Sequence, residues 1–161
     1  MLLEFKASNY KSFKEEMIFS LVPASKQKGL DYSILEEIIN KKTYRGLCSS
    51  VIYGSNASGK TNIISAMDTF KSIVLRGNLR NSAEKDNPNV AAGVLELIPN
   101  NSLETAEPVS FSIKFVVNGL LVEYSFSMDL GRFLDVEYPR KILSESLAVN
   151  ETLIFLLKEK L

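Results

Sequence analysis

Regular alternation of apolar and polar residues marks the second half of the chain. At least every second residue is apolar over 109–117 and again over 120–128, and the two runs flank the dipeptide Asn118-Gly119. Asn-Gly is a strong signal for a two-residue hairpin turn, and a period of two is typical of a strand with one buried face. Residues 141–149 and 152–160 resemble a second pair of strands. We therefore expect an antiparallel β-meander in this half.

The N-terminal region carries mixed patterns. Residues 2–7 and 17–22 predict two strands around a short turn. Residues 33–40 combine a capping-box pair, Ser33 and Glu36, with apolar residues at helical spacing. This combination predicts a helix, although the β-branched residues in the same segment also suit a strand.

An abrupt change of pattern follows. The apolar run 47–53 predicts a buried strand, which ends where eight small or polar residues begin at Gly54. From Ile63 to Val74 the apolar residues recur at helical spacing, and Gly77 stands where helices commonly end. We therefore expect a strand, a loop of small residues and a helix in succession. The polar run 78–89 predicts another loop after the helix.

Composition excludes several kinds of site. The 161 residues contain 19 Lys plus Arg and 19 Asp plus Glu, so no net charge draws the chain to DNA or lipid. There is no histidine and the one cysteine is Cys48, which excludes an intramolecular disulfide and argues against a zinc site. No segment approaches the ~20 apolar residues of a membrane helix, and the N-terminus lacks the apolar stretch of a secretion signal. We expect a soluble, cytoplasmic protein without a membrane partner.

The segment 54–61 fits the phosphate-loop pattern G-x-x-x-x-G-K-[ST]. Backbone N–H groups of such a loop cradle phosphates, which requires small side chains, and the following helix adds its free N–H groups and the positive end of its dipole. Lys60 is then placed to reach the β- and γ-phosphates, and Thr61 to offer its hydroxyl to Mg²⁺ as the metal ligand. The predicted binding residues are Gly54, Ser55, Asn56, Ala57, Ser58, Gly59, Lys60 and Thr61.

Two stretches together, EFKASNYKSFKEE at 4–16 and VIYGSNASGKTNIISAM at 51–67, resemble the N-terminal half of ABC-type AAA ATPases. The resemblance is to members related to the SMC, RecF and OLD proteins, and most of all to bacterial abortive-infection-type ATPases. It implies an α/β fold, in which the N-terminal lobe of a P-loop NTPase (strand, phosphate loop, helix) joins an antiparallel β-meander in an incomplete ABC-type head. It also implies ATP with Mg²⁺ as cofactors, and Lys11 and Ser12 as contacts near the phosphates or ribose.

Several single residues also have structural interpretations that do not involve a nucleotide. A solvated turn residue is an equally good interpretation of Lys11. Tyr10 and Phe13 are better interpreted as packing residues than as a platform for adenine, and Arg45 as an exposed structural charge. The aromatic residues of 109–128 alternate as core or sheet residues do.

The resemblance covers most of the chain, so we expect one partial ABC-type ATPase domain over 1–161. Within it, the nucleotide-binding part spans 1–76 and the antiparallel β-lobe spans 109–161. A complete head of this family works as a dimer, with ATP between the phosphate loop of one head and the signature of the other. The implied partner is a second ATPase head, either in a homodimer or as a missing half in another chain. Nucleic acid is a partner by family only, because the sequence has no basic stripe with interleaved aromatics.

Residues that hydrolysis requires in this family are missing from the sequence. Hydrolysis needs a second apolar strand that ends in Asp-Glu, but neither Asp129 nor Asp135 is followed by Glu, and Glu137 is not adjacent to Asp135. The chain has no Gly-Gly pair for the ABC signature, and its one glutamine, Gln27, precedes the phosphate loop instead of following it. We therefore identify no catalytic residue here and expect ATP hydrolysis only with residues from outside this chain.

The leading functional hypothesis is the ATP- and Mg²⁺-binding portion of an ABC-type AAA ATPase from a phage-defence or DNA-maintenance system. One alternative is a small P-loop kinase, although about fifty residues precede the loop and the 109–128 hairpin stands in place of βα repeats. A second alternative is a non-catalytic interaction module or a decayed fragment that has the fold without affinity for nucleotide.

Overall fold

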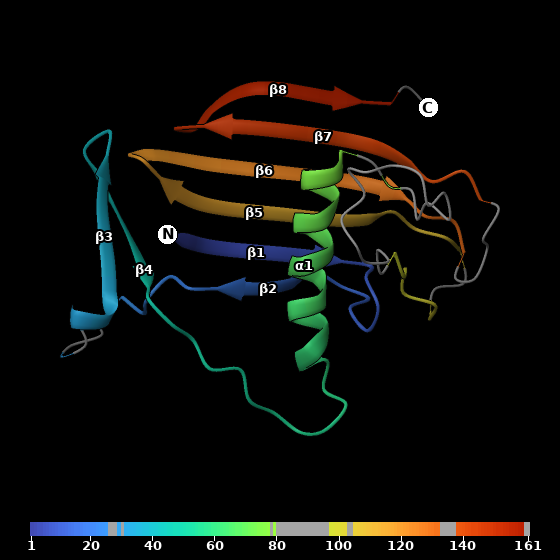
Figure 1. Cartoon of the computed structure of the whole chain (residues 1–161), viewed down its shortest axis with the longest axis horizontal. Coiled ribbons are helices and arrows are strands. Elements are labelled where there is room, and N and C mark those ends of the chain that lie inside the picture. Colours follow the sequence, from blue (N-terminus) through green and yellow to red (C-terminus); the bar gives the residue numbers. More distant parts are fainter. Residues whose placement is uncertain are drawn as a thin grey trace.

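The computed structural model describes residues 1–25, 29, 31–77, 79, 97–102, 105–132 and 138–159. Its main feature is an antiparallel sheet with the strand order β2-β1-β5-β6-β7-β8 (Figure 1). The strands are β1 Leu2–Ser8, β2 Met17–Ser20, β5 Val109–Val117, β6 Leu120–Asp129, β7 Lys141–Val149 and β8 Thr152–Lys158. The strand pairs predicted near both ends of the chain are therefore confirmed. The polar run 78–89 lies outside the described residues except for Leu79, which is buried.

Local turn chemistry sets the register of these hairpins. Asn118 and Gly119 have φ angles of 50° and 73°. Asn150 and Glu151 have φ angles of 51° and 66° between β7 and β8. Two consecutive residues with positive φ are what a type I′ turn requires, and its twist matches that of the flanking strands.

The prediction of a helix over residues 33–40 is wrong. Ile34–Ile39 form strand β3, which pairs with β4 (Lys42–Leu47) after a short 3₁₀ turn at Asp31–Ser33. Asn40 and Lys41 both have positive φ, so this hairpin also closes with a left-handed two-residue turn. The β-branched isoleucines and the turn outweigh the capping-box pattern. Ile39 is buried with Leu3, Val116 and Leu121 at the end of the large sheet, which anchors the upright hairpin of Figure 1.

The prediction of a buried strand over residues 47–53 is also wrong. Strand β4 ends at Leu47, and residues 48–54 form no strand. Val51 and Tyr53 are 83% and 90% exposed, and the connection swings out below the sheet as a long loop (Figure 1). A strand requires a neighbour for its backbone N–H and C=O groups, and among the described strands none lies beside this segment. Apolar sequence alone does not supply that neighbour.

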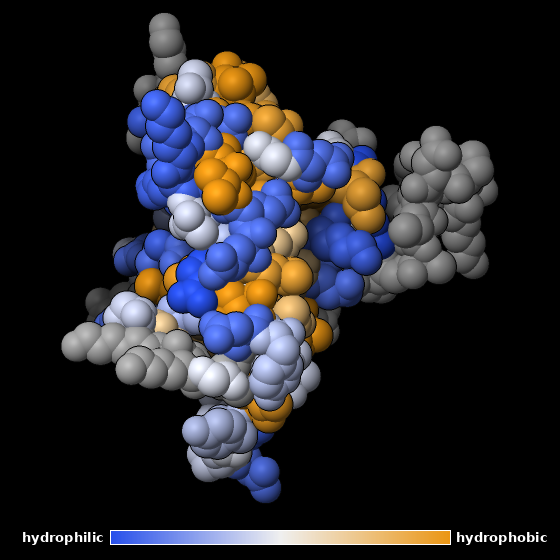
Figure 2. Space-filling model, turned by 90° about the vertical axis from the view of Figure 1, so that its left-hand side faces the viewer, coloured by the Kyte–Doolittle hydropathy of each residue, from blue (hydrophilic) through white to orange (hydrophobic). Residues whose placement is uncertain are grey.

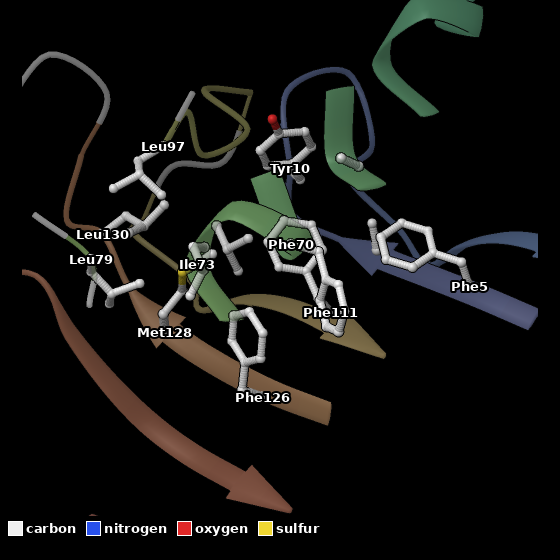
Figure 3. Packing of buried hydrophobic residues seen from close by; sticks show 13 residues of the cluster. Phe5, Tyr10, Phe70, Ile73, Leu79, Leu97, Phe111, Phe126, Met128 and Leu130 are labelled. Atoms are coloured by element: carbon white, nitrogen blue, oxygen red, sulfur yellow. The ribbon is translucent and has the colours of Figure 1, made fainter. Parts of the chain in front are cut away.

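Helix α1 (Lys60–Arg76) crosses one face of the sheet and closes the core. Phe70 stands at the centre: its ring packs against the rings of Phe5, Phe111 and Phe126 at centroid distances of 5.7, 6.2 and 5.4 Å (Figure 3). The helix ends as predicted at Gly77, which has a φ of 68° and donates its N–H to the Ile73 carbonyl. Among the described residues, no helix has the length and apolar character needed to cross a membrane.

The two faces of the large sheet differ in polarity: the face on the side of α1 has an apolar groove, and the opposite face carries serines. Beside the helix an apolar groove of about 860 Å³ stays open, with Leu147 and Phe155 in its lining. In the same lining the Tyr124 hydroxyl donates to Glu145 at 2.6 Å, and burial together with this carboxylate raises the pKa of Tyr124. The opposite face carries serines on neighbouring strands, with Ser125 and Ser146 hydroxyls 2.8 Å apart. One helix therefore covers only part of one face.

Candidate functional site

The small-residue segment forms a compact loop that leads directly into α1. The Ser58 N–H donates to the Ser55 carbonyl at 3.3 Å, which closes a tight turn. Ala57 and Gly59 have φ angles of 62° and 84°, while the residues around them have negative φ. Alternation of right-handed and left-handed residues is the backbone pattern that forms concave nests of N–H groups. The loop therefore shares with such nests the alternating sign of φ at Ala57 and Gly59.

Lys60 places a positive charge at this loop. Its ammonium donates to the Gly54 and Ser55 carbonyls at 2.8 and 2.6 Å, and it lies 3.4 Å from the Ser58 hydroxyl. The side chain thus folds back over the loop that precedes it. An ammonium held by carbonyl oxygens can exchange them for phosphate oxygens, which carry a full charge and accept stronger hydrogen bonds.

The first turn of α1 is left open to an anion. Its N-cap is Gly59, which has no side chain to cap the helix, and no acidic residue stands in the first turn. The free N–H groups and the positive end of the dipole at such a terminus favour negative charge. Thr61 is exposed there, so its hydroxyl is accessible beside the loop.

A second segment, the turn over residues 9–13 after β1, lies against the same helix. Tyr10 and Phe13 exchange backbone hydrogen bonds of 2.9 and 2.8 Å around the two residues between them. The Asn100 side-chain amide donates to the Lys11 carbonyl at 2.7 Å, and the buried Asn9 side chain donates to the Glu107 carbonyl. The turn is therefore fixed from both sides by distant parts of the chain.

Lys11 and Ser12 both reach the start of α1. The Asn62 side-chain amide donates to the Ser12 hydroxyl at 2.7 Å, and the Lys11 ammonium donates to the Ser65 hydroxyl at 2.6 Å. A methyl group added at Gly59 would stand 2.9 Å from the Ser12 oxygen. The structure thus brings the two predicted turn residues beside the loop and the first turns of the helix.

Tyr10 anchors this turn in the core. The side chain is fully buried, and its hydroxyl lies 3.0 Å from the Thr69 hydroxyl and 3.2 Å from that of Ser65. The packing role predicted for Tyr10 is confirmed, and Phe13 packs partly buried against the same cluster. Sequence reasoning missed the helix residues that hold the turn. Their signal was the spacing of Asn62, Ser65 and Thr69, three and four residues apart on one side of a helix.

Other predicted residues lie elsewhere. Arg45 is half-buried instead of exposed, and it pairs with Glu36 at 2.7 Å across the β3–β4 hairpin, so its role is structural. Asp129 accepts hydrogen bonds from the Gly131 N–H and the Tyr138 hydroxyl, which fixes the end of β6. Gln27, Asp135 and Glu137 lie outside the described residues.

Comparison with protein-family models matches residues 49–153 to a family described as "AAA domain, putative AbiEii toxin, Type IV TA system". The match covers more than half of the chain, and it includes the loop, α1 and strands β5 to β7. A search of curated proteins finds no match.

Proposed function

Because the chain belongs to the AAA-domain family whose description names the AbiEii toxin, a family of P-loop ATPases, we propose that residues 54–61 bind the phosphates of ATP together with Mg²⁺. The observation that carries the proposal is the position of the Lys60 ammonium, 2.6–2.8 Å from two loop carbonyls and next to a helix start without a cap. Positive charge and free N–H groups thus meet at one point.

Each residue of the loop has a role in this proposal. The backbone N–H groups of Ser55 to Gly59 surround the β-phosphate, and Lys60 moves from its carbonyl partners to the β- and γ-phosphates. Thr61 would supply one oxygen ligand to Mg²⁺, and the ion would help to neutralise the charge of the phosphates. The donor set fits, since Mg²⁺ in such sites usually has few protein ligands.

Lys11 and Ser12 extend the proposed site beyond the loop. The Ser12 oxygen stands close to Gly59, and the Lys11 ammonium is held one turn further along α1 by Ser65. A triphosphate in the loop would lie within reach of a lysine that exchanges this hydroxyl partner for a phosphate or ribose oxygen. We assign the two residues as additional nucleotide contacts.

ATP hydrolysis belongs to the proposal only with residues from outside this chain. The first turn of α1 contributes no carboxylate, and the sequence has no apolar strand that ends in Asp-Glu. The proposed partner is a second ATPase head, either in a homodimer or as a missing half in another chain. Only another chain could supply the missing groups, because a second copy of this sequence lacks them as well. The family description supports a toxin or abortive-infection setting for such an enzyme.

Equilibrium binding of a fluorescent ATP analogue in the presence of Mg²⁺ tests the proposal. Wild type is expected to bind, and Lys60→Ala to lose more than about tenfold in affinity, since it removes a charge-assisted contact with phosphate. Lys71→Ala is the matched control, because Lys71 is an exposed lysine on the same helix, three turns from the loop. Thr61→Val should weaken binding only when Mg²⁺ is present.

Two results would contradict this function. Wild type that does not bind the analogue would favour the interaction module, and equal binding by Lys60→Ala and wild type would place the nucleotide elsewhere. Phosphoryl transfer from ATP to a small acceptor by this chain alone would favour the kinase.

A further inference from the structure

The segment over residues 98–100 binds the backbone of the turn over residues 9–13. The Lys11 N–H donates to the Ile98 carbonyl at 3.0 Å. The Asn100 side-chain amide donates to the Lys11 carbonyl at 2.7 Å. Both backbone polar groups of Lys11 are therefore bound by a segment from a distant part of the sequence.

The backbone conformation of Lys11 needs such partners. Its φ is 48°, in the left-handed region that residues with a Cβ atom rarely adopt. Asn9 also has a positive φ, of 52°, and its carbonyl accepts a hydrogen bond of 3.0 Å from the Asn100 N–H. Asparagine tolerates this region better than lysine does. The hydrogen bonds from segment 98–100 therefore offset the cost of a left-handed residue most of all at Lys11.

The side chain of Asn100 is itself held in one orientation. Its oxygen accepts hydrogen bonds from the Ser102 N–H at 3.0 Å and from the Ser102 hydroxyl. Because the oxygen is engaged there, the amide nitrogen is the atom that faces the Lys11 carbonyl. Asn100 is half-buried, and the buried Pro99 before it forms an isolated β-bridge with Tyr10. The segment is thus fixed to the core beside the turn.

The backbone of Lys11 also sets the direction of its side chain. The ammonium lies 2.6 Å from the Ser65 hydroxyl of α1 and 5.6 Å from the centroid of the Tyr10 ring. A change of φ from the left-handed to the right-handed region would redirect the Cα–Cβ bond, and the ammonium with it. The conformation that segment 98–100 supports is therefore the one that brings this charge to α1.

We propose that Asn100 is a positioning residue of the nucleotide site, because its side-chain amide holds Lys11 in the conformation from which the ammonium binds a phosphate or ribose oxygen. The inference rests on the proposed function, and in particular on Lys11 as a nucleotide contact. When a binding group is in its competent conformation for only a fraction of the time, the apparent dissociation constant rises by the inverse of that fraction. Loss of the Asn100 donor should therefore weaken nucleotide binding through Lys11.

The opposite end of the sheet offers a control for stability alone. The turn over residues 9–13 follows the C-terminal end of β1, whereas the β3–β4 hairpin stands at the other end of the sheet (Figure 1). Figure 2 views the molecule from the hairpin side, where hydrophobic and hydrophilic side chains are interspersed on the surface. Ile39 of this hairpin is buried. Ile39→Ala therefore lowers stability at a distance from Lys11.

The affinity for a fluorescent ATP analogue with Mg²⁺ tests the positioning role. Asn100→Asp keeps the shape of the side chain and its acceptor toward Ser102, but it cannot donate to the Lys11 carbonyl. The dissociation constant should rise about three- to tenfold, the factor expected from one hydrogen bond. Asn101→Asp places the same charge on the neighbouring exposed residue and is the matched control. This control and Ile39→Ala should both bind like wild type.

A double-mutant cycle separates positioning from a general structural role. In a Lys11→Ala background, Asn100→Asp should have no further effect on affinity, because the side chain that it positions is absent. A general loosening of the turn would weaken binding by the same factor in both backgrounds. Asn100→Ala, with Asn101→Ala as its control, repeats the cycle without a new charge and replaces the aspartate variant if that one does not fold. Circular dichroism confirms the folding of each variant.

The outcomes distinguish this inference from the proposed function. Wild type that does not bind the analogue contradicts the proposed function, and this inference with it. If wild type binds in a Lys60-dependent way while Asn100→Asp and Asn101→Asp have equal affinities, only the positioning role is overturned. The same holds if Asn100→Asp weakens binding equally with and without the Lys11 side chain. Without nucleotide, amide hydrogen exchange at Lys11 should be faster in Asn100→Asp than in wild type, and equal rates would also overturn the positioning role.

Discussion

Replacement of Tyr10 by phenylalanine measures how firmly the turn over residues 9–13 is fixed to α1. The substitution keeps the ring in the core and removes only the hydroxyl, which lies 3.0 Å from the Thr69 hydroxyl and 3.2 Å from that of Ser65. Thr69 is 4% exposed, so water cannot easily replace the lost partner.

The magnitude follows from these contacts. A hydrogen bond contributes a net ~0.5–1.5 kcal/mol, and a buried hydroxyl left without a partner costs ~1–3 kcal/mol. In the variant, the Thr69 hydroxyl can still donate to a backbone carbonyl of the preceding helical turn. This alternative acceptor reduces the cost of leaving a buried hydroxyl without a partner. We therefore expect Tyr10→Phe to lower the free energy of unfolding by about 1.5–2.5 kcal/mol.

Urea denaturation followed by circular dichroism measures this change. A double-mutant cycle of Tyr10→Phe and Thr69→Val should give a coupling free energy of about 1 kcal/mol, since the second substitution has no hydroxyl partner left to lose. Tyr44→Phe is the matched control, because its hydroxyl bonds to Glu151 at the surface and should contribute under about 0.5 kcal/mol.

Two results would refute this reasoning. If Tyr10→Phe changed the unfolding free energy no more than Tyr44→Phe does, the buried hydroxyl would not hold the turn. If the effects of Tyr10→Phe and Thr69→Val simply added, the two hydroxyls would not interact.

Three further substitutions probe the core, the loop and the groove. Phe70→Ala removes the central ring and should cost ~3–5 kcal/mol of unfolding free energy in urea, whereas Ile64→Ala, on the exposed side of α1, should cost under about 1 kcal/mol. Gly59→Ala should destabilise more than Gly119→Ala in thermal unfolding: both have positive φ, but a methyl group has space only at position 119. Because burial raises the pKa of Tyr124 above 10, its contribution is present below pH 10 and is lost as pH rises further. An alkaline stability titration should therefore fall more steeply for wild type than for Tyr124→Phe, and equal slopes would contradict this.

Elements with a complete local signal were predictable from the sequence. Asn118-Gly119 specifies its turn by backbone conformation alone, and alternation on both sides then fixes the pairing of β5 with β6. Helix α1 has an unbroken apolar stripe and a glycine at its end. In both cases, residues adjacent in sequence determine the result.

Elements that depend on a distant partner were not predictable. Ser33 and Glu36 match a helix start, yet Glu36 pairs with Arg45 across a hairpin. The apolar run 47–53 has the composition of a buried strand, but no described strand lies beside it. For the site, the loop was visible as a motif, whereas the contact of Ser12 with Asn62 joins residues fifty positions apart. The spacing of the polar residues on α1 shows that they share one side of the helix, but it does not show that the turn over residues 9–13 is what they contact.

The position of β1 between β2 and β5 has a consequence for the order of folding. β1 pairs with β2 on one side and with β5 on the other, and Phe5 lies opposite Ile113. During synthesis β1 must therefore wait for about a hundred further residues before its second neighbour exists. Such distant pairing raises contact order and slows folding. The turn beside the loop is thus secured late in synthesis, and a chain truncated before Val109 would leave β1 with an open edge and Phe70 without most of its aromatic neighbours.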